Sequence, residues 1–309
     1  MRGPLIRKRG TIPFAVNEVT KKGPYPFFAK RPPGLRKNAT RQSASIPRKL
    51  LREGALHLLP VYYLLTLSDL AREGIANSGS FRFADHIYAG LPSGRTPLGR
   101  FLDRRLLATP AACAFRRRYQ RAQSAIRHAL ESAPADVFPL RVLAVPCGIP
   151  RDMTELAATL DRENPALVAR IEYHAMDIDP SVLCLARSVI GDSPLEAARY
   201  HCGDALSAAD YPPVAFHAIV STGLGDFLDD AELKMFYANV YRALEPGGTF
   251  YTSASARDPR SDALLRMVEL LPHYRTANQL EQILRGFTWR MLDLTVDETG
   301  LQTFVVAVK

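Results

Sequence analysis

Between Pro139 and the C-terminus, short apolar segments alternate with segments that have the periodicity of amphipathic helices. We expect seven strands, over residues 141–145, 170–175, 198–202, 217–221, 249–253, 288–296 and 301–308. We expect the intervening helices near residues 152–161, 180–190, 230–244 and 260–285. Repeated alternation of this kind predicts a parallel sheet with helices on both faces. A short turn over residues 297–300 joins the last two strands, so the final strand must run antiparallel to its neighbour.

The first expected strand ends in a pattern that is typical of a ligand-binding turn. The apolar run over residues 142–145 stops at the tight turn PCGIP (residues 146–150), and a helix-compatible segment begins near Asp152. Proteins with parallel sheets hold nucleotide-like ligands at such a junction, outside the carboxyl end of the strand. We expect Gly148 to matter most in this turn, because a side chain there would block the close approach of backbone and ligand.

The positive charge of the chain is concentrated at its N-terminus. The 309 residues carry a formal net charge of +9, and residues 1–53 contain 14 Lys or Arg and two Glu. The remaining residues therefore carry a net charge of −3, which weakens any argument from overall charge to nucleic-acid binding. We expect residues 1–47 to form a disordered basic tail, and the alternative is an arm that contacts acidic lipid or RNA.

Hydropathy and cysteine usage narrow the class of protein further. The sequence has no apolar run long enough to span a bilayer, and its N-terminus lacks a secretory signal. The four cysteines form no CxxC pair, which argues against a zinc site or a disulfide framework. We therefore expect a cytoplasmic protein with no transmembrane segment and no metal.

Residues 48–135 have helical periodicity, and we expect them to form a helical subdomain ahead of a domain over residues 136–309. A turn-rich part of this region carries His86, Tyr88, Arg95 and Arg100. Because an arginine in such a place can bind a carboxylate or phosphate, Tyr88, Arg95 and Arg100 are candidate substrate-binding residues. We expect the arginine run at residues 116–118 to form an exposed helix face.

Four motifs stand in order at the carboxyl ends of the first four expected strands. They are the turn with Gly148, HAMDIDP with Asp177, HCGDALSA with Asp204, and the segment STGLGDF at residues 221–227. Together with the terminal hairpin, this order resembles the class I S-adenosylmethionine-dependent methyltransferases over residues 139–309. The resemblance implies a Rossmann-like α/β fold, with a seven-stranded sheet, an antiparallel last strand and a helical N-terminal lid.

The resemblance also implies a cofactor, S-adenosylmethionine, and roles for individual residues. Asp177 would hold the ribose hydroxyls, and Asp204 with the amide of Ala205 would contact the adenine. The alternative role for Asp177, or for its neighbour Asp179, is to cap the following helix. The cofactor-binding residues implied are Pro146, Cys147, Gly148, Asp177, Ile178, Asp204, Ala205, Ser221, Thr222 and Gly223. Ala144 stands where the family has an acid, and prolines replace two of the family's glycines.

The chemistry expected of such an enzyme is an in-line displacement at an activated methyl group, for which alignment and desolvation supply most of the catalysis. A carboxylate acceptor needs no general base. A hydroxyl or amine acceptor does, and the candidate bases are His86, Tyr88 and Asp226.

Three hypotheses for the function stay open at this point. The segments PCGIPRD and STGLGDFLDD are loosely similar to those of bacterial enzymes that methyl-esterify hydroxy fatty acids, which makes a small-molecule or lipid acceptor the first hypothesis. The second is RNA methylation, suggested by the basic arm. The third is a non-catalytic protein with a cofactor fold, suggested by the missing glycines.

Overall fold

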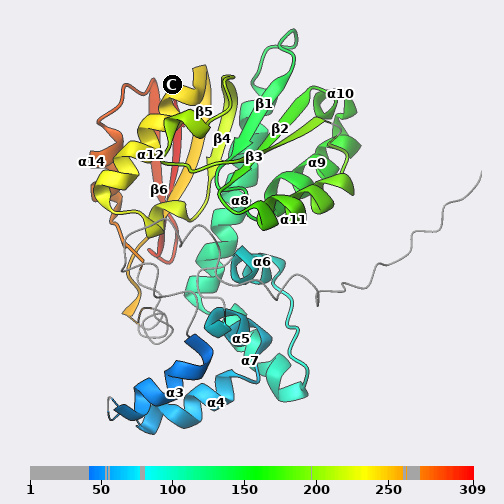
Figure 1. Ribbon diagram of the computed structural model, residues 1–309. Coiled ribbons are helices and arrows are strands. Elements are labelled where there is room, and N and C mark those ends of the chain that lie inside the picture. The colour runs from blue at the N-terminus through cyan, green and yellow to red at the C-terminus, as the bar shows by residue number, and fades with distance from the viewer. Residues whose placement is uncertain are drawn as a thin grey trace, which may run out of the picture.

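The computed structural model describes residues 42–52, 54, 56–76, 81–195, 197–259, 262 and 272–309. Most of the predicted tail over residues 1–47 lies outside these residues, and so does part of the predicted helix over residues 260–285. The described chain forms one sheet with helices on its two faces, and a group of N-terminal helices lies at one end of it (Figure 1).

Seven strands form the sheet, as the alternation of the sequence predicts. They are β1 (Leu140–Ala144), β2 (Ile171–Asp177), β3 (Ala197–Cys202), β4 (Phe216–Ser221), β5 (Leu244–Ser255), β6 (Met291–Val296) and β7 (Gln302–Val308). Their order in the sheet is β3-β2-β1-β4-β5-β7-β6. The first five run parallel, and β7 is antiparallel to both β5 and β6. The antiparallel last strand is therefore confirmed.

The strand order reverses at β1, which lies between β2 and β4. Loops that leave β1 and β4 at their carboxyl ends therefore diverge to opposite faces of the sheet. In open α/β sheets this switch point is the place where a crevice forms and where ligands bind. The predicted ligand-binding turn begins directly after Ala144, the last residue of β1.

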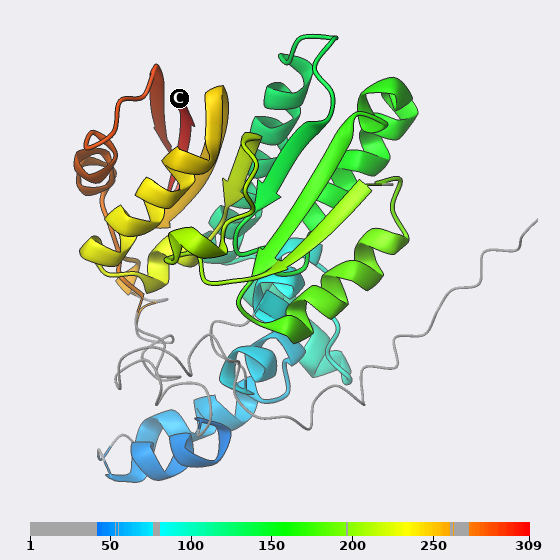
Figure 2. The same cartoon turned by 45° about the horizontal axis from the view of Figure 1, so that its top comes forward.

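Helices cover both faces of the sheet (Figures 1 and 2). One face packs against α8, α9 and α11, and the other packs against α12 and α14. Successive β1 residues alternate between the two cores, since Val142 and Ala144 face the first layer and Leu143 the second. The bounds are α8 (Pro110–Glu131), α9 (Arg151–Glu163), α10 (Pro165–Val168), α11 (Pro180–Gly191), α12 (Asp230–Ala243) and α14 (Ala277–Leu284), with short 3₁₀ turns η3 (Ala208–Asp210) and η4 (Leu224–Phe227).

The predicted helix over residues 260–285 is wrong in one part. Residues 272–276 are not helical, and α14 begins at Ala277 behind the N-cap Thr276. The backbone amides of His273 and Arg275 instead donate to the carbonyls of Asp226 and Ser255. These lateral bonds to the loop after β4 and to the end of β5 replace the bonds that a continuous helix would make.

The N-terminal helices are α3 (Gln42–Arg52), η2 (Leu56–Leu58), α4 (Leu59–Leu65), α5 (Asp69–Ala76), α6 (Phe81–Ala89) and α7 (Pro97–Leu107). Two small cores hold them together. Ile46, Leu50, Tyr62 and Ile75 form the first, and α5, α6, α7 and the start of α8 enclose the second. Among the described residues, none of the helices combines the length and the apolarity needed to cross a membrane.

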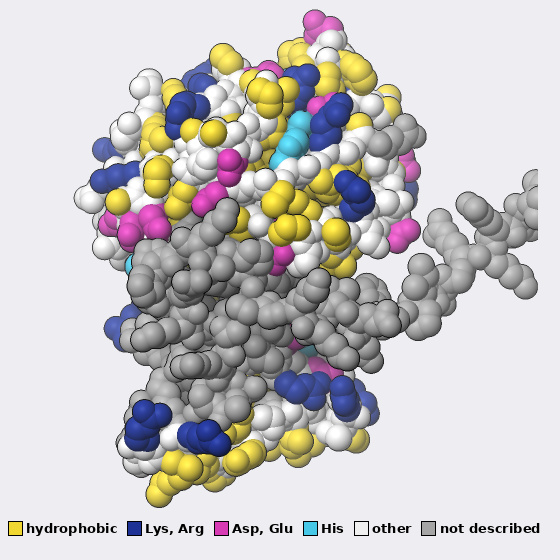
Figure 3. Space-filling model, viewed as in Figure 1, with side chains coloured by type: hydrophobic (Ala, Val, Ile, Leu, Met, Phe, Trp, Pro, Cys, Tyr) yellow, Lys and Arg dark blue, Asp and Glu magenta, His cyan; other side chains and the backbone are white. Residues whose placement is uncertain are grey.

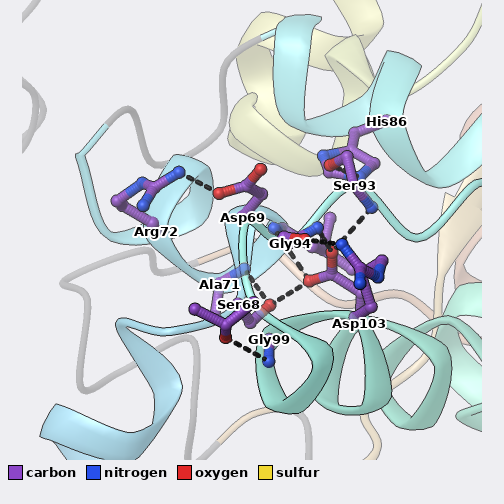
Figure 4. Close-up of polar contacts among 12 residues, drawn as sticks. Ser68, Asp69, Ala71, Arg72, His86, Ser93, Gly94, Gly99 and Asp103 are labelled. Atoms are coloured by element: carbon purple, nitrogen blue, oxygen red, sulfur yellow. Dashed lines mark hydrogen bonds and ion pairs between the residues drawn. The ribbon is translucent and has the colours of Figure 1, made fainter.

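Asp103 on α7 is the polar centre of the second group (Figure 4). Its carboxylate is fully buried and accepts hydrogen bonds from the Ser68 hydroxyl and from the backbone amides of Leu70, Ser93 and Gly94. Burial alone would raise the pKa of Asp103, but these hydrogen bonds lower it below the ordinary value. The ionised carboxylate therefore ties the start of α5 and the loop before α7 to α7 itself.

The long helix α8 belongs to both parts of the molecule. Its first turns pack against α6 and α7, and its remaining length lies on β4, β5 and β7. Half of its buried residues are alanines, among them Ala114, Ala122 and Ala125, which allow the helix to approach the sheet closely. The helical group is therefore attached to the sheet by a continuous helix.

We predict that Asp103→Ala will lower the free energy of unfolding by about 3 kcal/mol, because it leaves four donors, three of them in buried hydrogen bonds, without their acceptor. Urea denaturation measures the loss. The matched control is Asp69→Ala, which breaks a partly exposed ion pair with Arg72 within one helix turn and should cost less than about 1 kcal/mol. Equal losses for the two variants would contradict the central role of Asp103.

Candidate functional site

A pocket lies at the carboxyl ends of β1 and β4, where the sheet meets α6, α8 and the start of α9. Its walls combine apolar residues with two tyrosines, an arginine and a carboxylate. Its lining residues are Tyr88, Tyr119, Ala144, Pro146, Cys147, Ile149, Arg151, Asp152, Val220 and Thr222. The predicted site residues Tyr88, Pro146, Cys147 and Thr222 therefore lie together.

The turn after β1 crosses to the end of β2. The amide of Cys147 donates to the carbonyl of Met176 at 2.8 Å, and the amide of Gly148 donates to Oδ2 of Asp177 at 3.3 Å. Gly148 has a φ of +50°, a left-handed conformation that is strained for residues with a side chain. The backbone conformation therefore gives a reason for glycine at this position that is separate from the predicted close approach of a ligand.

Asp177 is the last residue of β2, and its carboxylate is buried. Besides Gly148, it accepts a hydrogen bond from the amide of Asp179, and within the part of the chain that the structure describes it makes no ion pair. Burial raises the pKa of Asp177 to about 6. Asp179, by contrast, caps α11, since its Oδ1 accepts from both the amide and the hydroxyl of Ser181. Capping is thus provided by Asp179, and Asp177 keeps further lone pairs for another donor.

The residues predicted for an adenine lie beside the end of β3. Asp204 is half-buried, and its Oδ1 accepts from the amide of Leu206. Ala205 is buried, and its carbonyl accepts from the side chains of Tyr211 and Asn239. Ile178, next to Asp177, is also buried. These residues lie along the same edge of the sheet as Gly148 and Asp177, at the carboxyl ends of the strands.

The strand β4 ends with Ser221, which is buried and whose hydroxyl has no hydrogen-bond partner in the described chain. Gly223 follows with a φ of +87°. A Cβ at this position would lie 3.2 Å from Nη1 of Arg118, so the glycine allows the guanidinium to rest on the loop. Gly223 therefore packs against α8.

The prediction of an exposed helix face over residues 116–118 is wrong for Arg118, whose side chain is only 3% exposed. Its Nη2 donates to the Tyr88 hydroxyl at 2.6 Å, and its guanidinium lies over the Phe115 ring at 4.1 Å from the centroid. Nη1 lies 3.9 Å from Oδ2 of Asp226. Arg118 thus joins two of the three candidate bases, which come from elements far apart in the sequence.

Asp226 lies in η4, and each oxygen of its carboxylate accepts a hydrogen bond. It accepts from the amide of Ser255 at 2.9 Å and from its hydroxyl at 2.8 Å. Burial raises the pKa of Asp226, and the nearby Arg118 opposes the rise. The geometry makes Asp226 a partner that positions Arg118.

Of the residues predicted in the N-terminal helical region, Tyr88 lines the pocket and the other three do not. His86 is half-buried and its Nε2 contacts the Leu91 carbonyl and the Ser93 hydroxyl (Figure 4). Arg95 and Arg100 are exposed, and Nη1 of Arg100 contacts the Gly94 carbonyl at 3.4 Å. Arg95 lies in the segment between α6 and α7, whose Ser93 and Gly94 amides bind Asp103. His86 and Arg100 contact this same segment.

Sequence reasoning missed the acidic group of the pocket. Asp152 is in the first turn of α9, and burial raises its pKa to about 6. Arg151 beside it pairs with Asp85 of α6, with Nε 2.6 Å from Oδ1, and Tyr119 donates to Glu155. These contacts fasten α6 and α8 to α9 around the pocket.

A signal for Arg118 was present in the sequence. Ala114, Ala122 and Ala125 are buried on one face of α8, and Arg118 stands four residues from two of them. A charged residue on the helix face that carries the small apolar residues is expected to be buried with them. The position of Arg118 on this face therefore predicts its burial, in spite of the neighbouring arginines.

Comparisons with known proteins agree with this geometry. The sequence profile of a family described as putative methyltransferases matches residues 68–309. Similar solved structures include a "possible exported protein" from Bordetella parapertussis, with a TM-score of 0.66 and 21% identity over 81% of this chain and 86% of that one. They also include the CMeT domain of the citrinin polyketide synthase, with a TM-score of 0.54 and 19% identity over 82% and 67%.

An O-methyltransferase family protein from Burkholderia thailandensis has a TM-score of 0.50 and 13% identity over 84% of this chain and 70% of that one. At these identities the likeness shows the fold, and it confirms the predicted Rossmann-like methyltransferase sheet. None of the curated proteins matches the sequence.

We predict that Arg118→Met will lower the free energy of unfolding by about 3 kcal/mol, because it removes a buried cation that lies 3.9 Å from the buried Asp226 carboxylate. The control is Arg127→Met. Arg127 lies on the same helix and pairs with Glu131 and Glu163 at the surface, so its loss should cost at most about 1 kcal/mol. Guanidinium denaturation measures the free energy of unfolding of both variants. Similar losses of stability would show that Arg118 acts as a surface residue.

Proposed function

The chain belongs to this methyltransferase family, and we propose that it transfers the methyl group of S-adenosylmethionine to a carboxylate oxygen of a small-molecule or lipid acceptor. The observation that carries the cofactor assignment is the buried Asp177 carboxylate beside the left-handed Gly148, at the switch point of the sheet. A sulfonium cofactor supplies a methyl group that is already activated, so the protein has to align the two reactants and exclude water.

The residues present fit such a cofactor. Asp177 has lone pairs left for a pair of ribose hydroxyls, and its burial excludes competing water. Ser221 offers a buried hydroxyl without a partner in the described chain. Asp204, Ile178 and Ala205 would flank the base, and the turn over residues 146–148 would line the other side.

Asp152 provides a carboxylate that the sequence pattern seemed to lack. The family has an acid at the position of Ala144, and in this chain both Ala144 and Asp152 line the pocket. The methionyl part of the cofactor carries an ammonium group, which needs a negative partner in a buried site. We assign that role to Asp152.

The acceptor oxygen would lie near Gly223, where the Arg118 guanidinium and the Tyr88 hydroxyl meet the loop after β4. None of the three candidate bases is free there. Tyr88 accepts two bonds from Arg118, Asp226 is held by Ser255, and His86 lies apart. An acceptor that needs no deprotonation, such as a carboxylate, is therefore favoured over a hydroxyl or an amine.

The competing hypothesis of RNA methylation rests on the basic N-terminal residues. Residues 54–309 carry a net charge of −3, so the part of the chain that holds the pocket offers no electrostatic attraction to phosphates. Strong RNA binding by the whole protein that weakens steeply with salt would favour this alternative.

The reaction can be tested by formation of S-adenosylhomocysteine with panels of carboxylic acids, alcohols and amines. A methyl ester releases methanol in mild alkali, whereas a methyl ether or methylamine does not. Alkali-stable products from alcohols or amines, with no turnover of acids, would contradict a carboxylate acceptor.

We predict that Asp177→Asn will weaken S-adenosylmethionine binding at least about tenfold, because the neutral amide is a poorer acceptor for two hydroxyls. Isothermal titration calorimetry measures the affinity. Asp161→Asn, an exposed change on α9, is the control and should leave it unaltered. Wild-type protein that binds no S-adenosylmethionine would support the non-catalytic alternative.

We predict that cofactor affinity will fall as the pH is lowered from 7 to 5. Asp177 and Asp152 both have pKa values of about 6, so both carboxylates are mostly ionised at the upper pH and mostly protonated at the lower. Loss of either charge weakens binding by up to about tenfold over this range. The fall should be shallower in Asp177→Asn, and a wild-type affinity independent of pH would show that neither carboxylate contacts the cofactor.

A further inference from the structure

A cluster of large apolar side chains is exposed on the first helices. Its exposed fractions run from 40% for Leu67 to 59% for Tyr63. We call it the N-terminal apolar patch, and it consists of Leu51, Leu56, Val61, Tyr63, Leu64 and Leu67. In Figure 3 apolar side chains gather at the lower end of the molecule, where Figure 1 places α3 and α4.

The patch is additional to the core of these helices. Tyr62 and Leu50 point inward with Ile46 and Ile75 to form that core, so the segment is apolar on its outer face as well. A helix that is apolar all round belongs in an interior or against another apolar phase, and solvent alone does not explain it.

The patch also lies outside the catalytic unit. The family profile begins at Ser68, and all six patch residues precede it. Ser68 is also the residue whose hydroxyl binds Asp103, so the polar centre of the lid starts where the patch ends. All the residues that line the pocket also follow Ser68 in the sequence.

Positive charge accompanies the patch. Arg48 and Arg52 on α3 are exposed, and residues 54–67 contain no charged residue. The preceding sequence, residues 1–41, has eleven Lys or Arg and one Glu. An apolar face joined to a strongly basic segment matches the interface of an anionic bilayer, where apolar side chains enter the acyl boundary and cations meet the headgroups.

We propose that the N-terminal apolar patch docks the protein on the surface of an anionic lipid membrane. A second copy of the chain is a poorer partner, because pairing two patches would bring together two segments that each carry a net charge of +12 over residues 1–53. Docking by an interfacial segment leaves the catalytic unit outside the bilayer.

The test uses the full-length protein and vesicle flotation. Binding is compared on vesicles of phosphatidylcholine and on vesicles of equal parts phosphatidylcholine and phosphatidylglycerol. We expect binding to the anionic vesicles, weakened about tenfold or more in the triple variant Leu56→Ser, Tyr63→Ser, Leu64→Ser. The double variant Arg48→Glu, Arg52→Glu should weaken it similarly and tests the charge even where the triple variant folds poorly.

The matched control is Met235→Ser with Met291→Ser, which removes equally exposed apolar side chains from the sheet domain and should leave flotation unchanged. Equal binding to neutral and anionic vesicles, binding insensitive to both patch variants, or no vesicle binding would overturn the proposal. A dimer seen by light scattering that the triple variant dissociates would assign the patch to self-association. Calorimetry measures S-adenosylmethionine binding by the same variants. A failure of membrane docking can then be distinguished from a failure of the proposed function.

Discussion

The buried guanidinium of Arg118 is the interaction on which the site depends. A cation with 3% exposure needs partners, and here they come from α6, from the aromatic ring of Phe115 and, at 3.9 Å, from Asp226 beyond β4. Because these partners lie on different elements, the charge can be accommodated only when the N-terminal helices rest on the loop after β4. The pocket, with Tyr88 on one side and Thr222 on the other, is a consequence of that arrangement.

Much of the sheet could be predicted from the sequence, because burial on both faces imposes near-continuous apolar strands and helical periodicity between them. The order of acids after the strands placed Gly148 and Asp177 at one edge for the same reason: parallel strands end together. What failed were predictions from local composition. The arginine run at residues 116–118 suggested a solvated face, and the non-helical residues 272–276 are decided by bonds to Asp226 and Ser255 that no local pattern encodes.

The role proposed for Asp152 illustrates that a chemical requirement can be met from another position in the sequence. Asp152 lines the same pocket as Ala144, where the family has an acid, and it approaches that pocket from the following helix. A sequence motif requires an acid at a fixed position in the chain. A bound ligand requires only that a negative charge lies near it in the folded structure, whichever residue carries that charge. Asp177 and Asp179 show the reverse case, because two acids in one motif have different roles. Asp179 caps the following helix, whereas Asp177 keeps lone pairs for another donor.

The continuity of α8 has a mechanical consequence. The helix has 22 residues, so it is a stiff rod of about 33 Å that runs from the N-terminal helices along one face of the sheet. A hinge between the two parts would have to bend that rod. The shorter helix α6 is joined to the site by the side-chain contacts of Asp85 with Arg151 and of Tyr88 with Arg118, so a shift of α6 would leave the rod unbent.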